Sequence, residues 1–524
     1  MYKADVAVVG GGHNGLICAA YLAKSGINTI LLEARSSVGG CASTVSDLGA
    51  RFNICSCEHG LVRAMPIIEE LELAKYGLSY VEPEASSVFA FYDDSEPWVI
   101  FSDVDKTLEG LSQSYPSQVE GYRRYLKDSI PIAMVALEMA ATVPSATRFT
   151  KTLIRQKGKG IIQLLEWSRS SATEILSRYF DDWHMIMPAI SVGPTVWGLA
   201  PDTPGTGLAA LGYATRHVNR TGRPVGGSGS FTEAVKAAFE ADGGKVICGA
   251  KVEQLFTDNN GVKGVRLENG DTVSTQIVVA ACDPNRVFSD WVSEPPKKAQ
   301  KMVKKWQNMP PQEGYQSKID GVLGDLPEPW WGAKIRQNYD GLDPLGQTTI
   351  LSPSPQDLAK AQELRFSGRV APNPTMLFDV PSVPDPQMRT SAGKHILSLE
   401  VLFTPYSLEG GWSSSQEPQR WLDLWASLME VGANEMLEDW RVVTPETYEK
   451  EFSMHKGHTP AFGGSPVGAF LGRPRELTRY KTDIEGLFLS GAATYPGAGI
   501  IGSSGRSCAY MVNSLLKSDL VRSK

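Results

Sequence analysis

A run of glycines near the start of the chain has the spacing of a dinucleotide site. Residues 10–15 read Gly-Gly-Gly-His-Asn-Gly, a G-x-G-x-x-G pattern. Gly10 permits a tight turn, Gly12 lets the backbone approach a pyrophosphate, and Gly15 allows a helix to pack closely on a strand. Glu33 lies 18 residues past Gly15, near the spacing of the acid that binds ribose hydroxyls. These residues predict a nucleotide site, and Glu33 disfavours a 2′-phosphate.

The elements expected around this pattern support the same interpretation. The apolar run at residues 6–9 is typical of a strand buried on both faces of a parallel sheet. Residues 16–24 predict a helix, whose N-terminus offers free N–H groups to phosphates. Residues 27–32 predict a second buried strand that ends at Glu33. The order of strand, helix, strand and acid predicts an α/β, Rossmann-like fold.

A second glycine pair indicates FAD rather than NAD. Residues 33–40 have the form E-x-R-x-x-x-G-G. The glycine pair lets another loop approach the diphosphate and ribityl chain, and Arg35 can offset phosphate charge. We find no second unit of strand, G-x-G-x-x-G and helix in the sequence. We therefore expect no dedicated NAD(P)H domain, and we expect electrons to leave to oxygen, a quinone or another carrier.

Three blocks of the sequence resemble FAD-dependent oxidoreductases of the amine oxidase and phytoene desaturase type. The first block is residues 10–40, and the second is residues 226–231, a glycine turn before a helix. The third, residues 491–502, looks like the G-x-x-T-x-P-G-x-G-x-x-G block of bacterial phytoene desaturases. The opening residues 12–16 resemble the branch of that family that includes pyridine nucleotide-disulfide oxidoreductase domain-containing protein 2.

The resemblance implies FAD as the cofactor. It places the first block at the diphosphate and ribose, Val252 beside the adenine, and the C-terminal block near the ribityl chain and the ring. A helix N-terminus after the C-terminal block would stabilise negative charge on the reduced flavin. The implied cofactor-binding residues are Gly10, Gly12, His13, Asn14, Gly15, Glu33, Ala34, Arg35, Gly39, Gly40, Cys41, Val252, Gly491, Ala492, Gly499, Ile500, Ile501 and Gly502.

The same resemblance implies two interleaved domains, as does a length of 524 residues. Residues 1–85, 226–290 and 455–524 are expected to form a Rossmann-like FAD-binding domain. Residues 86–225 and 291–454 are expected to form a mixed α+β substrate domain. The tryptophans concentrate in these last segments, which predicts a large apolar cavity, although ordinary core packing would also explain them.

Composition narrows the class of protein and its surroundings. A net charge of −7 argues against a nucleic-acid partner. Seven scattered cysteines do not form a disulfide framework, which favours a cytoplasmic location. The closest pair, Cys55-Ser56-Cys57, lacks the spacing of a redox dithiol. We predict no metal site, and the sequence makes no prediction of oligomeric state.

A basic segment predicts peripheral contact with a membrane. Five cations lie from Arg148 to Lys159, with apolar residues nearby. Such a segment can lie on an anionic lipid surface and give access to a lipid-dissolved substrate. A solvated surface helix is the alternative. The longest apolar stretch, residues 130–144, is too short to cross a bilayer.

Desaturation at a flavin requires an acceptor for a proton as well as for a hydride. Glu58 and His59 follow the glycine pair, in a region that the resemblance places beside the flavin ring. His455 and His458 precede the last FAD segment, and Tyr495 is expected to border the ring. These five residues are the catalytic candidates.

The preferred function is dehydrogenation, or desaturation, of a largely apolar organic substrate by hydride transfer to flavin N5. Three alternatives remain open on the sequence. The chain could be an amine oxidase with an aromatic cage, or a redox-neutral isomerase that requires reduced FAD. It could also be a non-catalytic binding protein of the GDP-dissociation-inhibitor type, although its intact phosphate glycines argue against this.

Overall fold

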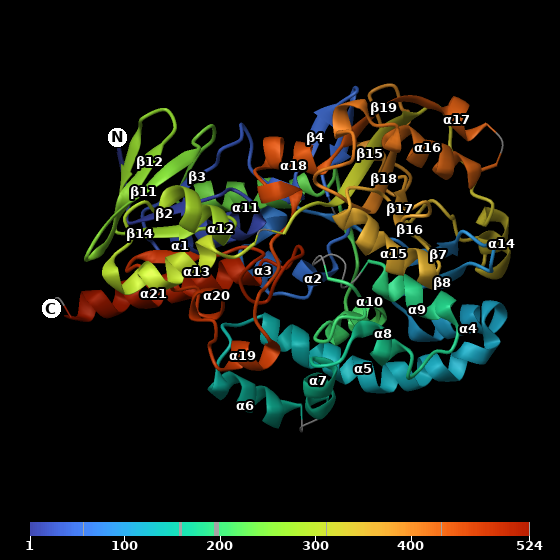
Figure 1. Ribbon diagram of the computed structural model, residues 1–524, viewed down its shortest axis with the longest axis horizontal. Helices are drawn as coiled ribbons and strands as arrows, with labels where there is room; N and C mark the ends of the chain where they lie inside the picture. Colours follow the sequence, from blue (N-terminus) through green and yellow to red (C-terminus); the bar gives the residue numbers. More distant parts are fainter. Residues whose placement is uncertain (56, 157–159, 193–198, 311, 431, 523–524) are drawn as a thin grey trace.

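The computed structural model describes residues 1–55, 57–156, 160–192, 199–310, 312–430 and 432–522. A parallel sheet in the order β10-β3-β2-β14-β20 is the centre of the lobe on the left of Figure 1. Its strands are β10 (Lys245–Ile247), β3 (Thr29–Leu32), β2 (Val6–Val9), β14 (Ile277–Ala280) and β20 (Leu487–Leu489). Strands from the start, middle and end of the chain are therefore hydrogen-bonded neighbours.

The two faces of this sheet are covered by different elements. Val6 and Val8 face a cluster with α1 (His13–Lys24), α11 (Gly229–Ala241) and α21 (Ser503–Arg522). Ala7 and Val9 face a second cluster. Its other members include side chains from the sheet of β1 (Tyr2–Lys3), β13 (Thr272–Ser274), β12 (Gly261–Leu267) and β11 (Val252–Asp258). Alternate residues of β2 thus face opposite layers, as a central strand requires.

The three helices on the first face begin earlier than the sequence predicts. The expected starts were residues 16, 232 and 506, whereas α1 begins at His13, α11 at Gly229 and α21 at Ser503. The first turn of each helix includes a glycine, namely Gly15, Gly229 or Gly505. Glycine in a first turn leaves room for close backbone contact. The sequence pattern alone assigns these glycines to the preceding turns.

A seven-stranded sheet forms the other lobe, on the right of Figure 1. Its order is β19 (Leu437–Val443), β15 (Tyr315–Leu323), β18 (His395–Thr404), β17 (Met376–Asp379), β16 (Thr348–Ser352), β7 (Ser87–Phe91) and β8 (Trp98–Ile100). A hairpin of β4 (Thr44–Asp47) and β5 (Ala50–Asn53) reaches it from the first lobe, with Phe52 packed against Val322 and Ile396.

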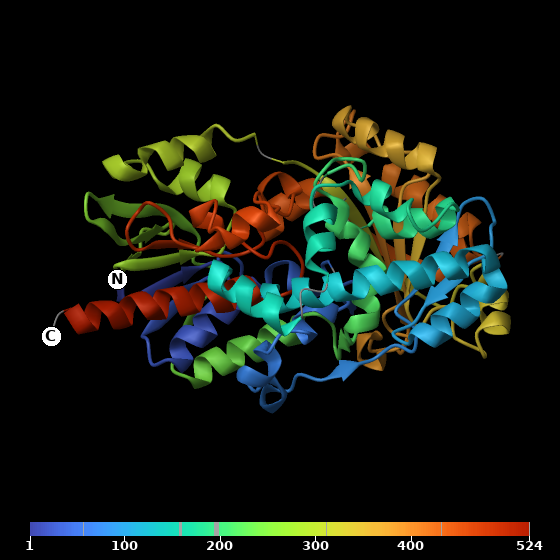
Figure 2. The ribbon, with the colours of Figure 1, turned by 90° about the horizontal axis from the view of Figure 1, so that it is seen from below.

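Helices cover both faces of this larger sheet. One cluster joins its buried side chains to α14 (Gly332–Asn338) and α16 (Glu417–Ser427). The other joins the opposite face to α5 (Val119–Ala140), α9 (Trp183–Ile190) and α10 (Gly212–Val218). Seen from below, α5 crosses the width of this lobe and continues toward α21 of the other (Figure 2).

Most of the tryptophans fill cores rather than line a cavity. Trp98, Trp167, Trp331, Trp421 and Trp425 have almost no exposed surface. Of the two explanations for the tryptophans, their burial favours ordinary core packing over the lining of a large cavity.

The packing of two tryptophans indicates where the FAD-binding domain ends. Trp291 and Trp306 pack in the cluster behind the five-stranded sheet, with α13 (Gln300–Gln307). Both tryptophans were expected in the substrate domain. We therefore propose that the first domain extends through α13 rather than ending at residue 290. In the described part of the chain, no helix has both the length and the apolar character that a membrane span requires.

Candidate cofactor site

Four parallel strands end at one edge of the five-stranded sheet, and the glycine-rich turns start there. Gly10 follows β2, Glu33 follows β3, and Gly491 lies two residues past β20. Ala281, after β14, donates its N–H to the Val9 carbonyl at 2.8 Å, and Ser490 donates to the Ala280 carbonyl at 2.9 Å. Nucleotides bind at the carboxyl ends of the strands in such sheets. Both ends of the chain therefore contribute to one edge.

The first glycine turn is shaped by contacts that only glycine permits. Gly10 has φ +102°, and a Cβ atom there would lie 2.8 Å from the Ala281 carbonyl oxygen. A Cβ atom on Gly15 would lie 1.9 Å from the Gly10 carbonyl oxygen. Gly12, by contrast, has open space where a Cβ would be, and no side chain caps the helix that follows it. The first N–H groups of α1 can therefore be approached by a phosphate group.

Two backbone N–H groups hold the Glu33 carboxylate at this edge of the sheet. Its carboxylate accepts hydrogen bonds from the Gly11 N–H at 2.6 Å and the Arg35 N–H at 2.8 Å. Gly39 donates its own N–H to the Gly11 carbonyl at 2.8 Å, so the second glycine pair lies against the first turn. The Arg35 guanidinium donates to Ser43 Oγ at 3.0 Å. A carboxylate and a guanidinium thus border the same glycine-lined surface.

The C-terminal block meets the N-terminal turn directly. Gly505 donates its N–H to Asn14 Oδ1 at 3.3 Å, and a Cβ atom on Gly505 would lie 2.1 Å from the Asn14 carbonyl oxygen. The His13 side chain hydrogen-bonds the backbone of Gly499, and burial lowers the pKa of His13 to about 4. In the described part of the chain, the buried hydroxyl of Ser503, at the start of α21, has no hydrogen-bond partner.

The remaining implied cofactor residues lie along these two turns. Ala250 donates its N–H to the Glu33 carbonyl at 2.8 Å, which places Val252, 5% exposed, two residues from that contact. A Cβ atom on Gly502 would meet Ile17 of α1 at 2.6 Å. The other implied cofactor-binding residues are adjacent in sequence to residues already placed at this edge. They are Ala34, Gly40, Cys41, Ala492, Ile500 and Ile501.

The residues present therefore fit FAD. The open backbone at Gly12, the acid at Glu33 and the partnerless hydroxyl of Ser503 supply groups suited to a diphosphate, a ribose and a polar ring edge.

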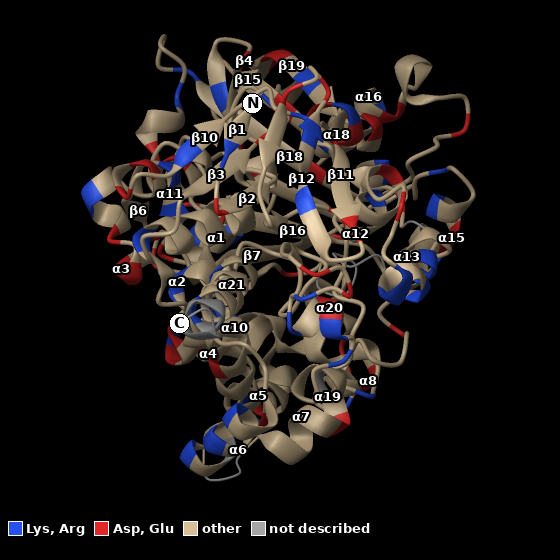
Figure 3. Cartoon of the chain, turned by 90° about the vertical axis from the view of Figure 1, so that its left-hand side faces the viewer, with Lys and Arg blue, Asp and Glu red and all other residues tan. Residues whose placement is uncertain are grey.

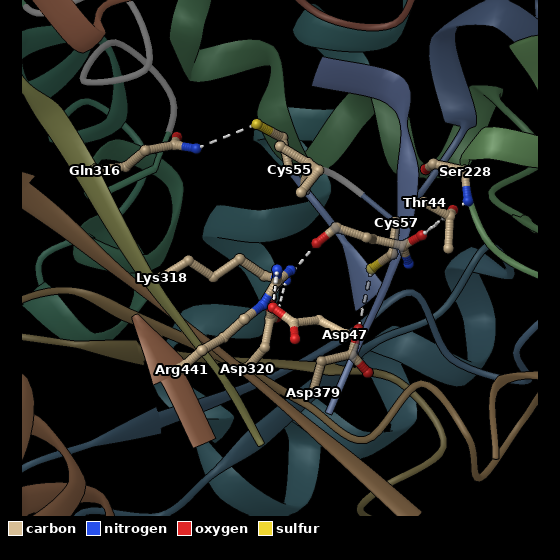
Figure 4. A network of polar contacts seen from close by, with 12 residues as sticks. Thr44, Asp47, Cys55, Cys57, Ser228, Gln316, Lys318, Asp320, Asp379 and Arg441 are labelled. Carbon is tan, nitrogen blue, oxygen red and sulfur yellow. Dashed lines mark hydrogen bonds and ion pairs between the residues drawn. The ribbon is translucent and has the colours of Figure 1, made fainter. Parts of the chain in front are cut away.

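A polar network lies between the two lobes, where Asn53, Cys57 and Glu58 meet side chains of the larger sheet. Arg223, on the short strand β9 (Arg223–Pro224), pairs with Asp379 of β17 at 2.9 Å and with Glu58 at 3.3 Å. Thr348 of β16 donates to Glu58 at 3.1 Å. The Cys57 thiol donates to Asp379 at 3.0 Å (Figure 4). The Glu58 side chain thus lies beside a buried guanidinium.

A second polar group, which the sequence analysis missed, lies on the same face of the sheet. Lys318 of β15 donates to the Asn53 carbonyl at 2.5 Å and is paired with Asp320. Arg441 of β19 joins Asp320 at 2.8 Å (Figure 4). Glu400 of β18 lies opposite Lys318 in the strand register. Burial raises the pKa of Glu400 to about 7, against the lowering effect of Lys318. Only the pairing of distant strands brings these residues together.

Comparisons with known proteins agree with this geometry. Residues 8–66 match the family model for an NAD(P)-binding Rossmann-like domain. The chain is 25% identical to pyridine nucleotide-disulfide oxidoreductase domain-containing protein 2 of Rattus norvegicus, over 98% of this chain and 94% of that one. It is 27% identical to a lycopene-forming phytoene desaturase of Pantoea ananas, over 97% and 99% of the two chains. A solved putrescine oxidase triple mutant shares the fold, with a TM-score of 0.62 and 15% identity over 99% of both chains.

The chain is thus similar over nearly its whole length to a phytoene desaturase and to pyridine nucleotide-disulfide oxidoreductase domain-containing protein 2. Both the sheet edge that would hold the nucleotide and the likeness over nearly the whole length support this relationship.

Among the described residues, no hydrogen bond or ring contact joins the five predicted catalytic residues into one cluster. His59 is fully buried, bonds Ser228 Oγ at 3.0 Å and packs against Phe231. Burial lowers the pKa of His59 to about 3, so the ring is neutral. These contacts favour a packing role for His59 over proton transfer, which leaves Glu58 as the stronger candidate of the two.

The other three candidates come from the last segment. His455 is partly exposed, with Nδ1 3.8 Å from the Glu449 carboxylate. His458 is 2% exposed and lies edge-on to Tyr315, and burial lowers its pKa to about 4. Tyr495 packs edge-on against Phe462, and burial raises its pKa. Of these, His458 and Tyr495 are buried and His455 lies nearer the surface.

Proposed function

We propose that this protein uses FAD to dehydrogenate a largely apolar organic substrate. The observation that carries the proposal is the contact of the N-terminal glycine turn with the C-terminal segment, through Asn14 to Gly505 of α21 and through His13 to the backbone of Gly499. Both turns are needed to hold one FAD molecule along its whole length. The similarity to a phytoene desaturase over nearly the whole chain favours a substrate of the apolar class.

The chain's own residues would hold and polarise the cofactor. The α1 N-terminus and Gly12 would bind the diphosphate, and Glu33 would accept hydrogen bonds from the ribose. Val252 would lie beside the adenine, and the start of α21 beside the ring, where its positive dipole end would favour negative charge. FAD, when bound, supplies the acceptor for the hydride, at N5 of its ring.

One proton leaves the substrate together with the hydride, and two carboxylates are candidates to accept it. Glu58 is oriented by Arg223 and Thr348. Glu400 has a pKa raised to about 7 by burial, which is well matched to proton transfer near neutral pH. Both carboxylates belong to the interface between the Asn53–His59 segment and the larger sheet. Electrons would then leave the flavin to oxygen, a quinone or another carrier.

We also propose that the lower edge of the molecule contacts a lipid surface. Ile154 of α6 (Ala146–Arg155) and Ile162 of α7 (Ile161–Trp167) are 73% and 77% exposed. Leu471, after α19 (Pro466–Phe470), is 64% exposed. Phe149 of α6 stacks on Phe470 of α19 at 4.5 Å, so these elements form one protrusion (Figure 1).

The charge of this protrusion suits anionic lipids. Arg148 and Lys151 are exposed on α6. The end of α6 is blue in Figure 3, at the lowest part of the view. Exposed apolar side chains flanked by cations favour binding to an anionic lipid surface. Such contact would bring a lipid-dissolved substrate to the protein.

Anaerobic mixing tests the proposed reaction. The purified flavoprotein is mixed without oxygen with polyenes, unsaturated lipids and primary amines in turn, and the visible absorbance of the oxidised flavin is followed. We expect bleaching by a polyene or lipid, and recovery of the absorbance when oxygen or a quinone is added. Bleaching by amines alone would contradict the proposal and favour an amine oxidase. The Glu58→Gln variant should bind FAD normally but bleach at least about tenfold more slowly.

A further inference from the structure

Two cysteines that are distant in sequence meet at the base of the β4–β5 hairpin. Cys41 lies in the short 3-10 turn Gly40–Ala42, directly after the second glycine pair, and Cys55 lies two residues beyond β5. The hairpin pairs Thr44 with Asn53, and Ile54 extends the pairing by donating its N–H to the Ser43 carbonyl at 3.1 Å. The two arms therefore remain side by side up to the cysteines. The Cys55 thiol donates a hydrogen bond to the Cys41 sulfur, and the Cys41 thiol donates to Met454 Sδ at 3.3 Å.

The surroundings make the two thiols unequal. The hydrogen bond from Cys55 lowers the pKa of the Cys41 thiol, and the nearby Arg35 guanidinium lowers it further. The same hydrogen bond, together with burial, raises the pKa of the Cys55 thiol. Gln316 Nε2 donates to Cys55 Sγ at 3.5 Å (Figure 4). Cys41 thus has the features of an attacking thiol, and Cys55 those of a partner that holds its proton.

Neither cysteine of the pair is fully enclosed by the protein. Cys41 and Cys55 are each partly exposed. Thiols in hydrogen-bond contact need only small side-chain rotations to reach the geometry of a disulfide. The spacing of the cysteines in the sequence gave no indication of this pair, because the hairpin between them brings them together.

We propose that Cys41 and Cys55 form a reversible dithiol–disulfide couple that exchanges with low-molecular-weight disulfides. The Cys41 thiolate attacks one sulfur of the external disulfide, forming a mixed disulfide and releasing one thiolate. The Cys55 thiol then loses its proton and attacks the Cys41 sulfur, forming the internal disulfide and releasing the second thiol. One external disulfide is reduced to two thiols, and the two cysteines lose two electrons and two protons.

A second pair of neighbouring cysteines provides an internal control for oxidation. Cys18 of α1 and Cys508 of α21 also hydrogen-bond each other, but both have no exposed surface. They lie in the apolar cluster between the two helices. An external disulfide cannot reach that pair in the folded protein. We therefore expect oxidation at Cys41 and Cys55 while Cys18 and Cys508 stay reduced.

Oxidation would act on the cofactor turn. Cys41 follows Gly39 and Gly40, which lie against Gly11 and Gly12. Cys55 begins the stretch that leads to Glu58. A covalent bond between these points would fix the glycine pair relative to that segment, so the redox state of small thiols would be transmitted to the nucleotide edge.

Peptide mapping tests the proposal directly. The purified holoprotein is equilibrated with glutathione buffers from fully reduced to fully oxidised, alkylated, and digested with trypsin without reduction. Cleavage after Arg35, Arg51 and Arg63 separates residues 36–51, with Cys41, from residues 52–63, with Cys55 and Cys57. We expect these two peptides to appear joined, with a mass two hydrogens below their sum, and to separate after treatment with dithiothreitol.

Two variants assign the bond. Cys57→Ser should leave the joined peptides unchanged, because the Cys57 thiol is engaged by Asp379. Cys55→Ser should abolish them and leave Cys41 carrying glutathione, since no partner resolves the mixed disulfide. Free thiols at Cys41 and Cys55 in fully oxidised glutathione would overturn the proposal. So would joined peptides that persist in Cys55→Ser, or a crosslink at Cys18 and Cys508 that forms first.

Discussion

At the scale of single residues, Glu400 carries the clearest dependence on pH. Its carboxyl lies on a central strand, opposite Lys318 and near Asp320 and Cys55. Burial raises the pKa of Glu400 from 4.5 to about 7, and Asp320 adds to the rise while Lys318 opposes it. Between these two pKa values the folded protein holds a proton that the unfolded chain has lost. The free energy of unfolding must therefore fall as the pH rises through this range.

The Glu400→Gln variant should lack this dependence. The lost contribution is at most about 1.4 kcal/mol for each pH unit between the two pKa values. Urea unfolding at pH values of about 5 and about 8 would measure it, with the variant gaining on the wild type at the higher pH. Glu438→Gln, at an exposed carboxyl of β19, is the matched control. An identical pH slope in wild type and Glu400→Gln would contradict the expectation.

The sequence pattern located the glycine turn and the acid that lie together at the sheet edge. Gly10, Gly12, Gly15 and Glu33 could be found because strand, turn and helix are consecutive. Arg223 and Asp379, which are 156 positions apart, could not be found in this way. Their contact depends on how β9 and β17 are placed in the fold, and nothing in the neighbouring sequence encodes that placement.

At the scale of elements, the protrusion formed by α6, α7 and α19 invites a test of lipid binding. Ile154 and Ile162 expose most of their surface beside the cations of α6. Placing a carboxylate at either position removes apolar area from the contact and repels anionic headgroups. Ile154→Asp or Ile162→Asp should weaken binding to vesicles of phosphatidylglycerol and phosphatidylcholine by about tenfold, as measured by cosedimentation.

Phe366→Asp is the control for this experiment. Phe366 is 70% exposed at the end of α15 (Pro355–Phe366), which lies above α6, α7 and α19 in Figure 1. Its replacement should leave vesicle binding unchanged. Equal losses in all three variants, or no binding by the wild type, would show that the protrusion has no special affinity for lipid.

Element boundaries were predicted less well than element types. The strands and helices of the nucleotide lobe occur where the sequence indicated, but α1, α11 and α21 each start three residues earlier. Sequence patterns mark glycine as a helix breaker, whereas here each glycine lies in a first turn that another backbone must approach. The β4–β5 hairpin also had no clear sequence signal, although it joins the two lobes.

At the scale of the whole molecule, the nucleotide edge needs strands from three separate parts of the chain. The sheet order places β14 between β2 and β20. Adding FAD to the cofactor-depleted protein should therefore raise the free energy of unfolding of the entire structure. The increase should be about 2.7 kcal/mol at an FAD concentration one hundred times the dissociation constant. Thermal denaturation with and without FAD would measure it.

The Gly505→Ala variant should lose much of this effect. Its methyl group would collide with the Asn14 carbonyl oxygen and separate α21 from α1. The matched control is Gly212→Ala on α10, where a Cβ atom has room. We expect the flavin content of purified Gly505→Ala to fall by at least about tenfold, while Gly212→Ala retains it. A folded Gly505→Ala protein with full flavin content would show that FAD binding does not depend on the contact between α1 and α21.

The contact between α1 and α21 also has a consequence during synthesis. A ribosome releases the Gly10–Gly15 turn hundreds of residues before β20 and α21 exist. A nascent chain that lacks its final helix has only part of the surface that would retain the cofactor. Flavin capture is therefore expected to follow synthesis of α21, so a tightly bound yellow chromophore would mark those chains that contain this helix.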